Sequence, residues 1–231
     1  MSAVRGVVFD KDGTLFDFAR TWEAWALAFL DRISDTPGQM RALGNRIGFD
    51  TDAARFERNS IVIAGTPAEV AAALAPGLPE MTQNRMLAIL NEEAARAPQA
   101  EVLPLVPFLS GLRGLGLRLG VATNDAEAPA RAHLSAAGAL EMFDFIAGSD
   151  SGFGGKPAAG QLLAFCEAVA LNPSEVIMVG DSTHDLFAGQ AAGMRTVGVL
   201  TGFATAQTLR PHATVVLDDI SHLPRWIAEQ P

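Results

Sequence analysis

The sequence has little positive charge and almost no lysine. The 231 residues include 17 basic and 26 acidic side chains, which gives a formal net charge of −9. Nucleic acids and anionic membranes are bound through basic patches, so this charge argues against both kinds of partner. It is compatible with an enzyme for a small anionic substrate, which needs only a local positive site. Only two of the basic residues are lysines, Lys11 and Lys156.

Cysteine and long apolar runs are equally scarce. The single cysteine, Cys166, cannot form an internal disulfide, and its apolar surroundings favour a core residue in a reducing compartment. The first apolar run meets Asp10 too soon for a signal peptide, and no later run approaches the roughly 18 uncharged residues of a membrane span. We therefore expect a cytoplasmic protein of one or two domains with no membrane partner.

Short apolar runs alternate with helical patterns along most of the chain. The runs lie at 4–9, 117–122, 143–148, 175–180, 195–200 and 213–218. The helical patterns between them lie at 126–137, 158–170 and 184–193. Continuous apolar strands that alternate with helices are typical of a parallel sheet covered on both faces. The sequence therefore predicts an α/β fold with a doubly wound parallel-sheet (Rossmann-like) core.

One interval breaks this alternation, because more than 100 residues separate the first two strands, where a βαβ unit takes about 30. Helical patterns fill it at 18–33, 37–48 and 80–97, with a helix start at Thr66-Pro67-Ala68-Glu69 and one short strand candidate at 60–65. We expect an all-helical cap domain at 18–103, inserted into a core domain made of 1–17 and 104–231.

Two of the predicted strands end in paired carboxylates. Asp10 and Asp12 follow the first strand in DKDGT, and Asp181 and Asp185 follow the strand at 175–180 in GDSTHD. Ligand sites of open α/β sheets lie at these carboxyl ends. Paired carboxylates can act as nucleophile and acid/base or hold a hard cation, and all-oxygen ligation favours Mg²⁺ over zinc. The local alternatives are an Asx turn for the first pair and a helix N-cap for the second.

Two further segments could supply hydrogen-bond donors and positive charge to such a site. Thr123 and Asn124 follow the strand at 117–122, and Lys156 follows a glycine-rich loop in GGKP. A lone lysine before proline is usually solvated, but the chain has so few lysines that we favour an anion-binding role for Lys156. Lys11 lies between two aspartates that face one way, so we expect its side chain to point elsewhere.

The ordered set DKDGT, ATND, GGKP and GDSTHD resembles the four motifs of the haloacid dehalogenase-like hydrolase superfamily. With a helical insertion directly after the first motif, the chain is similar to the phosphoglycolate phosphatase-like subgroup with a C1-type cap. The resemblance implies that Asp10 attacks phosphorus and that Asp12 acts as general acid and base. It also implies Mg²⁺ held by the Asp10 carboxylate, the Asp12 backbone carbonyl and Asp181, with Asp185 in support. Thr123, the Asn124 backbone N–H and Lys156 would bind the phosphoryl oxygens.

The function expected from this resemblance is a Mg²⁺-dependent phosphatase that hydrolyses a small, phosphoglycolate-like phosphomonoester through an aspartyl phosphate. Its partner would be a small phosphorylated metabolite, and the chain could be a monomer or a homodimer. One alternative is a phosphomutase of the β-phosphoglucomutase kind, which shares all four motifs. A remote alternative is a non-catalytic binding protein on the same fold.

The cap sequence does not identify the substrate. Arg41 or Arg46 could pair with a carboxylate such as that of phosphoglycolate, but both also read as solvated helix arginines. Trp22, Trp25 and Phe29 recur at helical spacing, which favours core packing of the cap over substrate stacking. The histidines do not show metal-site spacing, and His184 reads as a spacer within the fourth motif.

Overall fold

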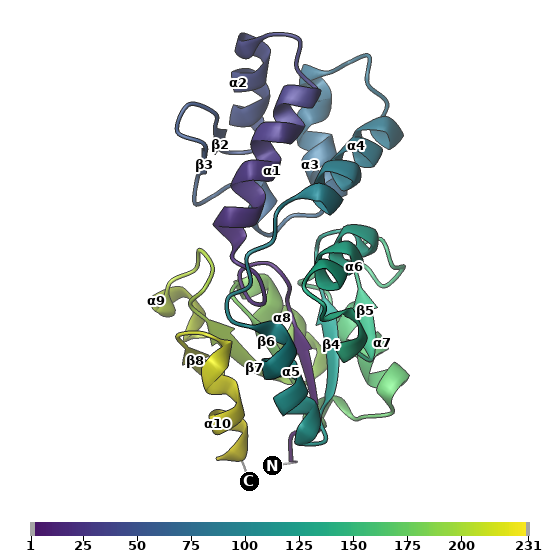
Figure 1. The fold of residues 1–231 in the computed structure, drawn as a ribbon, viewed down its shortest axis with the longest axis vertical. Coiled ribbons are helices and arrows are strands. Elements are labelled where there is room, and N and C mark those ends of the chain that lie inside the picture. Colours follow the sequence, from purple (N-terminus) through teal and green to yellow (C-terminus); the bar gives the residue numbers. More distant parts are fainter. Residues whose placement is uncertain (1–2, 230–231) are drawn as a thin grey trace.

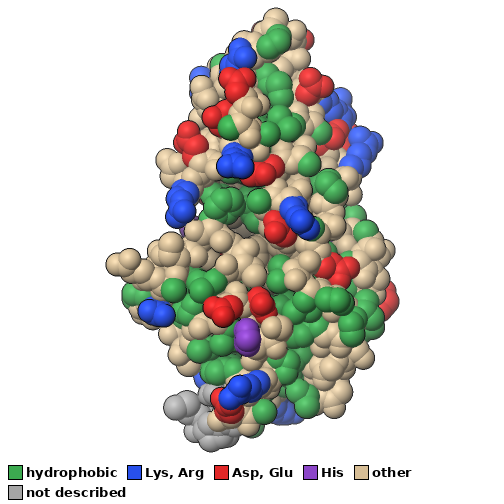
Figure 2. Space-filling model, turned by 60° about the vertical axis from the view of Figure 1, so that its left-hand side comes forward, with side chains coloured by type: hydrophobic (Ala, Val, Ile, Leu, Met, Phe, Trp, Pro, Cys, Tyr) green, Lys and Arg blue, Asp and Glu red, His purple; other side chains and the backbone are tan. Residues whose placement is uncertain are grey.

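A computed structural model describes residues 3–229 and shows two parts, a sheet with helices on both faces and a group of helices above it (Figure 1). None of the helices in residues 3–229 combines the length and apolar composition needed to cross a bilayer. On the face seen in Figure 2, acidic and basic side chains are interspersed and no broad patch of one sign forms.

The lower part is built on six parallel strands, in the order β5-β4-β1-β6-β7-β8. The strands are β1 (Gly6–Phe9), β4 (Arg118–Ala122), β5 (Phe145–Ala147), β6 (Val176–Gly180), β7 (Arg195–Val199) and β8 (Val215–Leu217). Each falls within one of the six predicted runs, and the predicted fold class is confirmed. All residues of β1 and β6 are buried, because these central strands are covered on both faces.

Five helices cover the two faces of this sheet. They are α5 (Leu105–Gly114), α6 (Glu127–Ala136), α7 (Gly160–Val169), α8 (Thr183–Ala192) and α10 (Leu223–Ala228), and the short α9 (Ala206–Leu209) follows β7. Side chains of α5, α6 and α10 pack into one hydrophobic cluster with the sheet, and those of α7 and α8 pack into another. Helix α8 is followed by its C-cap residue Gly193 in the left-handed region (φ 79°), which glycine adopts readily.

The upper part is formed by the inserted residues. Its helices are α1 (Phe18–Arg32), α2 (Pro37–Arg46), α3 (Pro67–Leu74) and α4 (Gln83–Arg96). They enclose a hydrophobic cluster of their own, to which the described residues of the lower part contribute only Phe203. Helix α3 begins with the predicted capping box between Thr66 and Glu69. The insert thus has a hydrophobic core of its own, and its bounds as a cap domain at 18–103 stay a prediction.

The chain enters and leaves the insert through two segments that lie side by side. The Asp17 N–H donates to the Ala100 carbonyl over 2.8 Å, and the Val102 N–H donates to the Leu15 carbonyl over 3.0 Å. Phe16 and Glu101 form an isolated antiparallel bridge at the same place. The two crossings therefore form one narrow, hydrogen-bonded connection between insert and sheet.

The insert differs from the sequence prediction in two places. A two-stranded antiparallel hairpin joins β2 (Phe49–Asp50) and β3 (Arg55–Phe56), which the sequence did not predict. The strand candidate at 60–65 instead forms a short 3₁₀ helix at Ile61–Ile63. Two-residue strands are too short to show an alternating pattern, and three apolar residues fit either a turn of helix or a strand.

The separate core of the insert predicts a large effect for the fully buried Phe29, whose ring stacks on Trp25 at a centroid distance of 5.1 Å. We expect Phe29→Ala to lower the free energy of unfolding by about 3–5 kcal/mol, since it leaves a cavity. Urea unfolding measures this, with Leu115→Ala as the matched control because Leu115 is 61% exposed. Equal effects of the two substitutions would argue against this core.

Candidate active site

The predicted site residues meet at the point where the strand order reverses. Strand β1 lies between β4 and β6, so the chain runs outward from β1 in both directions across the sheet. Asp10, Thr123 and Asp181 follow these three strands directly and are all buried. Their side chains come together because parallel strands place their carboxyl ends at one edge, where open α/β sheets bind ligands.

A cavity lies between this edge and the insert. It contains about 660 Å³ of space outside the atoms, part of which is open solvent. All seven residues that the motifs single out line it: Asp10, Asp12, Thr123, Asn124, Lys156, Asp181 and Asp185. The structure thus brings the four motifs to one place, and the role of each residue stays a prediction.

Lys156 is the positive centre of the site. Its Nζ lies 2.5 Å from Asp10 Oδ1 and 2.7 Å from Asp185 Oδ1, and all three residues are buried. Burial lowers the pKa of Lys156, but the two carboxylates outweigh it and hold the pKa above its ordinary value. The ammonium group therefore stays charged and offsets the negative charge of its two partners.

The carboxylates nevertheless outnumber this cation. The pKa of Asp10 is raised to about 7, mainly by burial, with Lys156 opposing the rise and Asp185 and Asp12 adding to it. Burial, Asp10 and Asp185 raise the pKa of Asp181 well above its ordinary value. Carboxylates that raise one another's pKa in this way leave room for further positive charge in the site.

The residues present fit a divalent cation. Carboxylate oxygens of Asp10, Asp181 and Asp185 lie within 4.8 Å of one another. This is an all-oxygen donor set, which suits Mg²⁺. Both oxygens of Asp185 have other partners, Lys156 for Oδ1 and Ser182 for Oδ2, which suits a supporting position better than a direct ligand.

Glycine is required beside Asp181. Gly13 has a φ of +80°, and a Cβ there would lie 2.6 Å from the Asp181 Cγ. A Cβ at Gly202 would overlap the same carboxylate. Two backbone segments, the DKDGT turn and the loop after β7, therefore pass against Asp181 and restrict where its oxygens can lie.

Asn124 fixes the position of Lys156. Its side-chain Oδ1 accepts from the Lys156 N–H at 2.8 Å, and its Nδ2 donates to the Lys156 carbonyl at 2.9 Å. The same Nδ2 also donates to the carbonyl of Ala64 in the insert at 2.7 Å. The side chain of Asn124 thus holds the lysine loop and the insert together.

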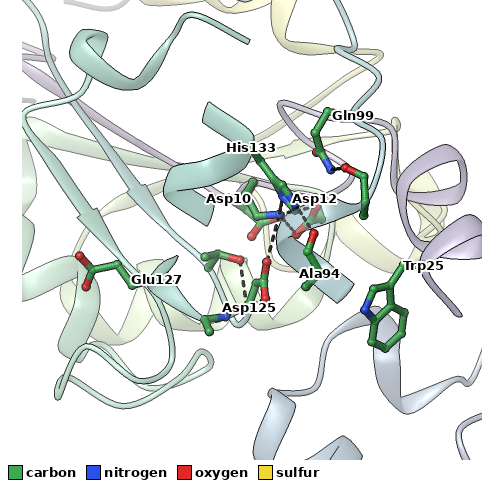
Figure 3. Close-up of polar contacts among 12 residues, drawn as sticks. Asp10, Asp12, Trp25, Ala94, Gln99, Asp125, Glu127 and His133 are labelled. Carbon is green, nitrogen blue, oxygen red and sulfur yellow. Dashed lines mark hydrogen bonds and ion pairs between the residues drawn. The ribbon is translucent and has the colours of Figure 1, made fainter. Parts of the chain in front are cut away.

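Lys11 was expected to point elsewhere, and it does not line the cavity, but its ammonium group pairs with a residue that does. Its Nζ lies 2.7 Å from Asp12 Oδ2 and 3.3 Å from Asp125 Oδ2. Figure 3 shows the side chains of Asp12, Asp125 and His133 close together. Lys11 is completely buried and does not line the cavity, so it contacts the predicted acid/base, Asp12, on the side away from the cavity. Burial raises the pKa of Asp125 to about 6 although Lys11 opposes it.

His133 extends this group of side chains to the insert. Its Nδ1 lies 3.0 Å from the Lys11 Nζ, and its Nε2 lies 2.6 Å from the carbonyl oxygen of Ala94 on α4. An ammonium only donates and a carbonyl only accepts, so the neutral ring donates through Nε2 and accepts through Nδ1. Burial lowers the pKa of His133 to about 4, and the charge of Lys11 acts in the same direction.

Sequence reasoning missed the contributions of five residues to the site. Lys11 and His133 are 122 residues apart, and nothing in their local sequence links them. His184 lines the cavity, although it was interpreted as a spacer. Trp22 and Trp25 are buried in the insert's core as expected, but they also line the cavity. The scarcity of lysine was the one signal that could have drawn attention to Lys11.

The comparisons with known proteins agree with this geometry. The model of the haloacid dehalogenase-like hydrolase family matches residues 4–193, and the chain belongs to this family. A relative named "Probable phosphatase IndB" from Dickeya dadantii is 31% identical over 94% of this chain and 90% of its own. The phosphoglycolate phosphatase of Rhodospirillum rubrum is 33% identical over 55% of this chain and 54% of its own, about half of each.

A solved structure supports the fold over nearly the whole chain. CbbY from Rhodobacter sphaeroides, crystallised in complex with phosphate, has a TM-score of 0.71 over 95% of this chain and 96% of its own, at 20% identity. The resemblance to the phosphoglycolate phosphatase-like subgroup, predicted from the four motifs and the insertion, is confirmed by the matches to the family model and to phosphoglycolate phosphatases.

The position of Lys156 predicts a measurable stability effect without added metal. Lys156→Met leaves two buried carboxylates without their cation, so we expect the free energy of unfolding to fall by roughly 3 kcal/mol. Denaturant unfolding in the presence of a chelator measures this. The control is Arg41→Ala, which removes an exposed ion pair with Asp52 and should have little effect. An unchanged midpoint in Lys156→Met would contradict the pairing.

The buried His133 predicts an acid sensitivity of known sign. Its pKa is lowered from 6.5 to about 4, so between these values the unfolded chain binds more protons than the native one. The free energy of unfolding should therefore fall as the pH decreases through this window, by at most about 3 kcal/mol from this residue. We expect a shallower fall in His133→Asn, measured by urea unfolding at pH 7 and pH 4.5. His222→Asn, at an exposed histidine, is the control, and equal slopes in all three proteins would refute the assignment.

Proposed function

We propose that this protein is a Mg²⁺-dependent phosphatase that hydrolyses a small phosphomonoester through a phosphorylated Asp10. The observation that carries this proposal is the placement of Asp10 at the end of β1, with its Oδ1 2.5 Å from a buried ammonium group and Asp12 on the same cavity. A carboxylate that faces a cavity beside a fixed cation and a second carboxylate has the parts needed for a two-step phosphoryl transfer.

In the first step a carboxylate oxygen of Asp10 attacks phosphorus, and the bond between phosphorus and the leaving oxygen breaks. Asp12 gives its proton to that oxygen, so that the alcohol leaves neutral. In the second step Asp12 takes a proton from a water molecule as the water oxygen attacks the phosphorus atom bound to Asp10. The bond between phosphorus and Asp10 breaks, which releases inorganic phosphate and restores the Asp10 carboxylate.

The negative charge of the transferred phosphoryl group would be stabilised by hydrogen-bond donors that the fold holds in place. The Lys156 ammonium, the Thr123 hydroxyl and the Asn124 backbone N–H lie at the same cavity and would bind the phosphoryl oxygens. The contacts of Asn124 with Lys156 hold the ammonium in place before substrate arrives, which limits reorganisation during the reaction. When bound beside Asp10 and Asp181, Mg²⁺ would supply the positive charge that lets an anionic substrate approach these carboxylates.

The comparisons and a further contact of Asp12 both support this proposal. The family model describes a hydrolase, and two relatives are named as phosphatases. Lys11 supports the role of Asp12, because an ion pair on the side away from the cavity fixes the carboxylate without blocking it. We expect a soluble phosphorylated metabolite as substrate and a cytoplasmic location.

The proposal predicts that Asp10→Asn abolishes hydrolysis. The amide is a poor nucleophile, so phosphate release should fall at least about a thousandfold with Mg²⁺ present, while thermal unfolding shows an intact fold. Free phosphate and isomerised hexose phosphate are measured separately, which distinguishes a phosphatase from a phosphomutase. Asp218→Asn is the matched control, since Asp218 is exposed and does not line this cavity. Undiminished phosphate release by Asp10→Asn would refute the mechanism.

A further inference from the structure

The two walls of the cavity differ in chemistry. The wall formed by the sheet part carries the carboxylates and Lys156. The wall formed by the insert is apolar, with Trp22 and Trp25 from α1, Ile63 from the short 3₁₀ helix, Val70 from α3 and Leu90 from α4. The part of a substrate that extends away from phosphorus therefore meets hydrophobic side chains, which favour an apolar group.

Within residues 3–229, no lysine or arginine of the insert lines the cavity. Among the described residues that line it, Lys156 is the only lysine or arginine, and Asp10 and Asp185 already engage its ammonium group. The two arginines that could have bound a substrate carboxylate, Arg41 and Arg46, do not line the cavity, and Arg41 instead pairs with Asp52 at the surface. His184 is the other lining residue able to carry positive charge, and it lies on the wall of the sheet part.

A carboxylate on the leaving alcohol would be poorly accommodated here. It would lose water against the apolar wall without gaining a cationic partner from the insert. It would also approach a wall that carries five aspartates, so unfavourable charge would add to the cost of desolvation. The cavity thus disfavours the carboxylate of 2-phosphoglycolate on physical grounds.

Polar groups on the insert wall are neutral. The indole Nε1 of Trp22 and the amide Oδ1 of Asn91 are buried atoms without a hydrogen-bond partner among the described residues. Both residues line the cavity, whereas the Nε1 of Trp25 already donates to the Leu90 carbonyl at 3.4 Å. A donor and an acceptor left without partners can be satisfied by a hydroxyl or amide group on a ligand.

We propose that the substrate is a phosphomonoester of an uncharged, mainly apolar alcohol, whose polar groups beyond the phosphate are neutral. The proposal rests on the phosphatase function proposed above and specifies the substrate class of that same cavity. Trp22, Ile63, Val70 and Leu90 are the residues that would discriminate against a carboxylated alcohol.

The test compares phenyl phosphate with 4-carboxyphenyl phosphate, a pair that differs only by the carboxylate. Hydrolysis is followed with the full chain and Mg²⁺. The carboxylate makes the phenol a slightly better leaving group, so the intrinsic chemistry favours the carboxylated ester. We expect kcat/KM to be at least about tenfold higher for phenyl phosphate, because the carboxylate has no partner on the insert wall.

A variant that supplies the missing cation provides the second measurement. Ile63→Arg places a guanidinium on the insert wall at a partly exposed position and should reduce the preference for phenyl phosphate several-fold. Ile61→Arg is the matched control, since Ile61 lies in the same 3₁₀ helix and does not line the cavity. The ratio of the two kcat/KM values is taken within each variant, so a partial loss of folded protein cancels.

The outcomes separate this proposal from the one on which it rests. If kcat/KM for 4-carboxyphenyl phosphate equals or exceeds that for phenyl phosphate, and phosphate release depends on Asp10, the proposed substrate class is overturned and the phosphatase function stands. No Asp10-dependent release from either ester would overturn both proposals. An equal change of the ratio in Ile61→Arg and Ile63→Arg would overturn the assignment of the insert wall.

Discussion

The ammonium group of Lys156 is the constraint on which the rest of the site depends. The strand order brings carboxylates from β1 and from the start of α8 to one buried edge, where they repel one another. Lys156 binds one carboxylate from each source and so offsets part of that repulsion. The lysine in turn keeps its place because Asn124, at the end of β4, binds its backbone on both sides. One cation thereby ties together four segments that are distant in the sequence.

A second buried lysine connects this site to the insert. Lys11 binds Asp12 and Asp125, lies 5.3 Å from the centroid of the Trp22 ring, and touches His133, which donates to the Ala94 carbonyl. These contacts place a neutral histidine between an ammonium group and a backbone carbonyl, an arrangement that only the unprotonated ring can satisfy. The position of the predicted acid/base is therefore linked to helices that belong to the insert.

The sequence predicts the sheet and the location of the site better than it predicts the details of either. Six apolar runs identify the strands because buried parallel strands need continuous apolar residues, and the motifs at their ends identify the site because the topology gathers those ends. The β2–β3 hairpin could not be predicted because two-residue strands are too short to show a pattern.

The direction of the Lys11 side chain could not be predicted because it depends on tertiary partners. These partners, Asp125 and His133, lie far along the chain from Lys11. The apolar wall of the insert could not be predicted either. Helical spacing predicts that Trp22 is buried, but it does not predict that Trp22 lines a cavity.

The paired crossing at Phe16 and Glu101 has a consequence for how such a protein can change over time. Because the insert departs and returns at adjacent points, replacing everything between them alters neither the strand order nor the spacing of the carboxylates at the sheet edge. The carboxylates on the sheet edge and the apolar wall that faces them can thus be inherited as separate modules. A new insert on the same sheet would place a different wall opposite unchanged carboxylates, which makes this hydrogen-bonded connection a natural boundary for recombination.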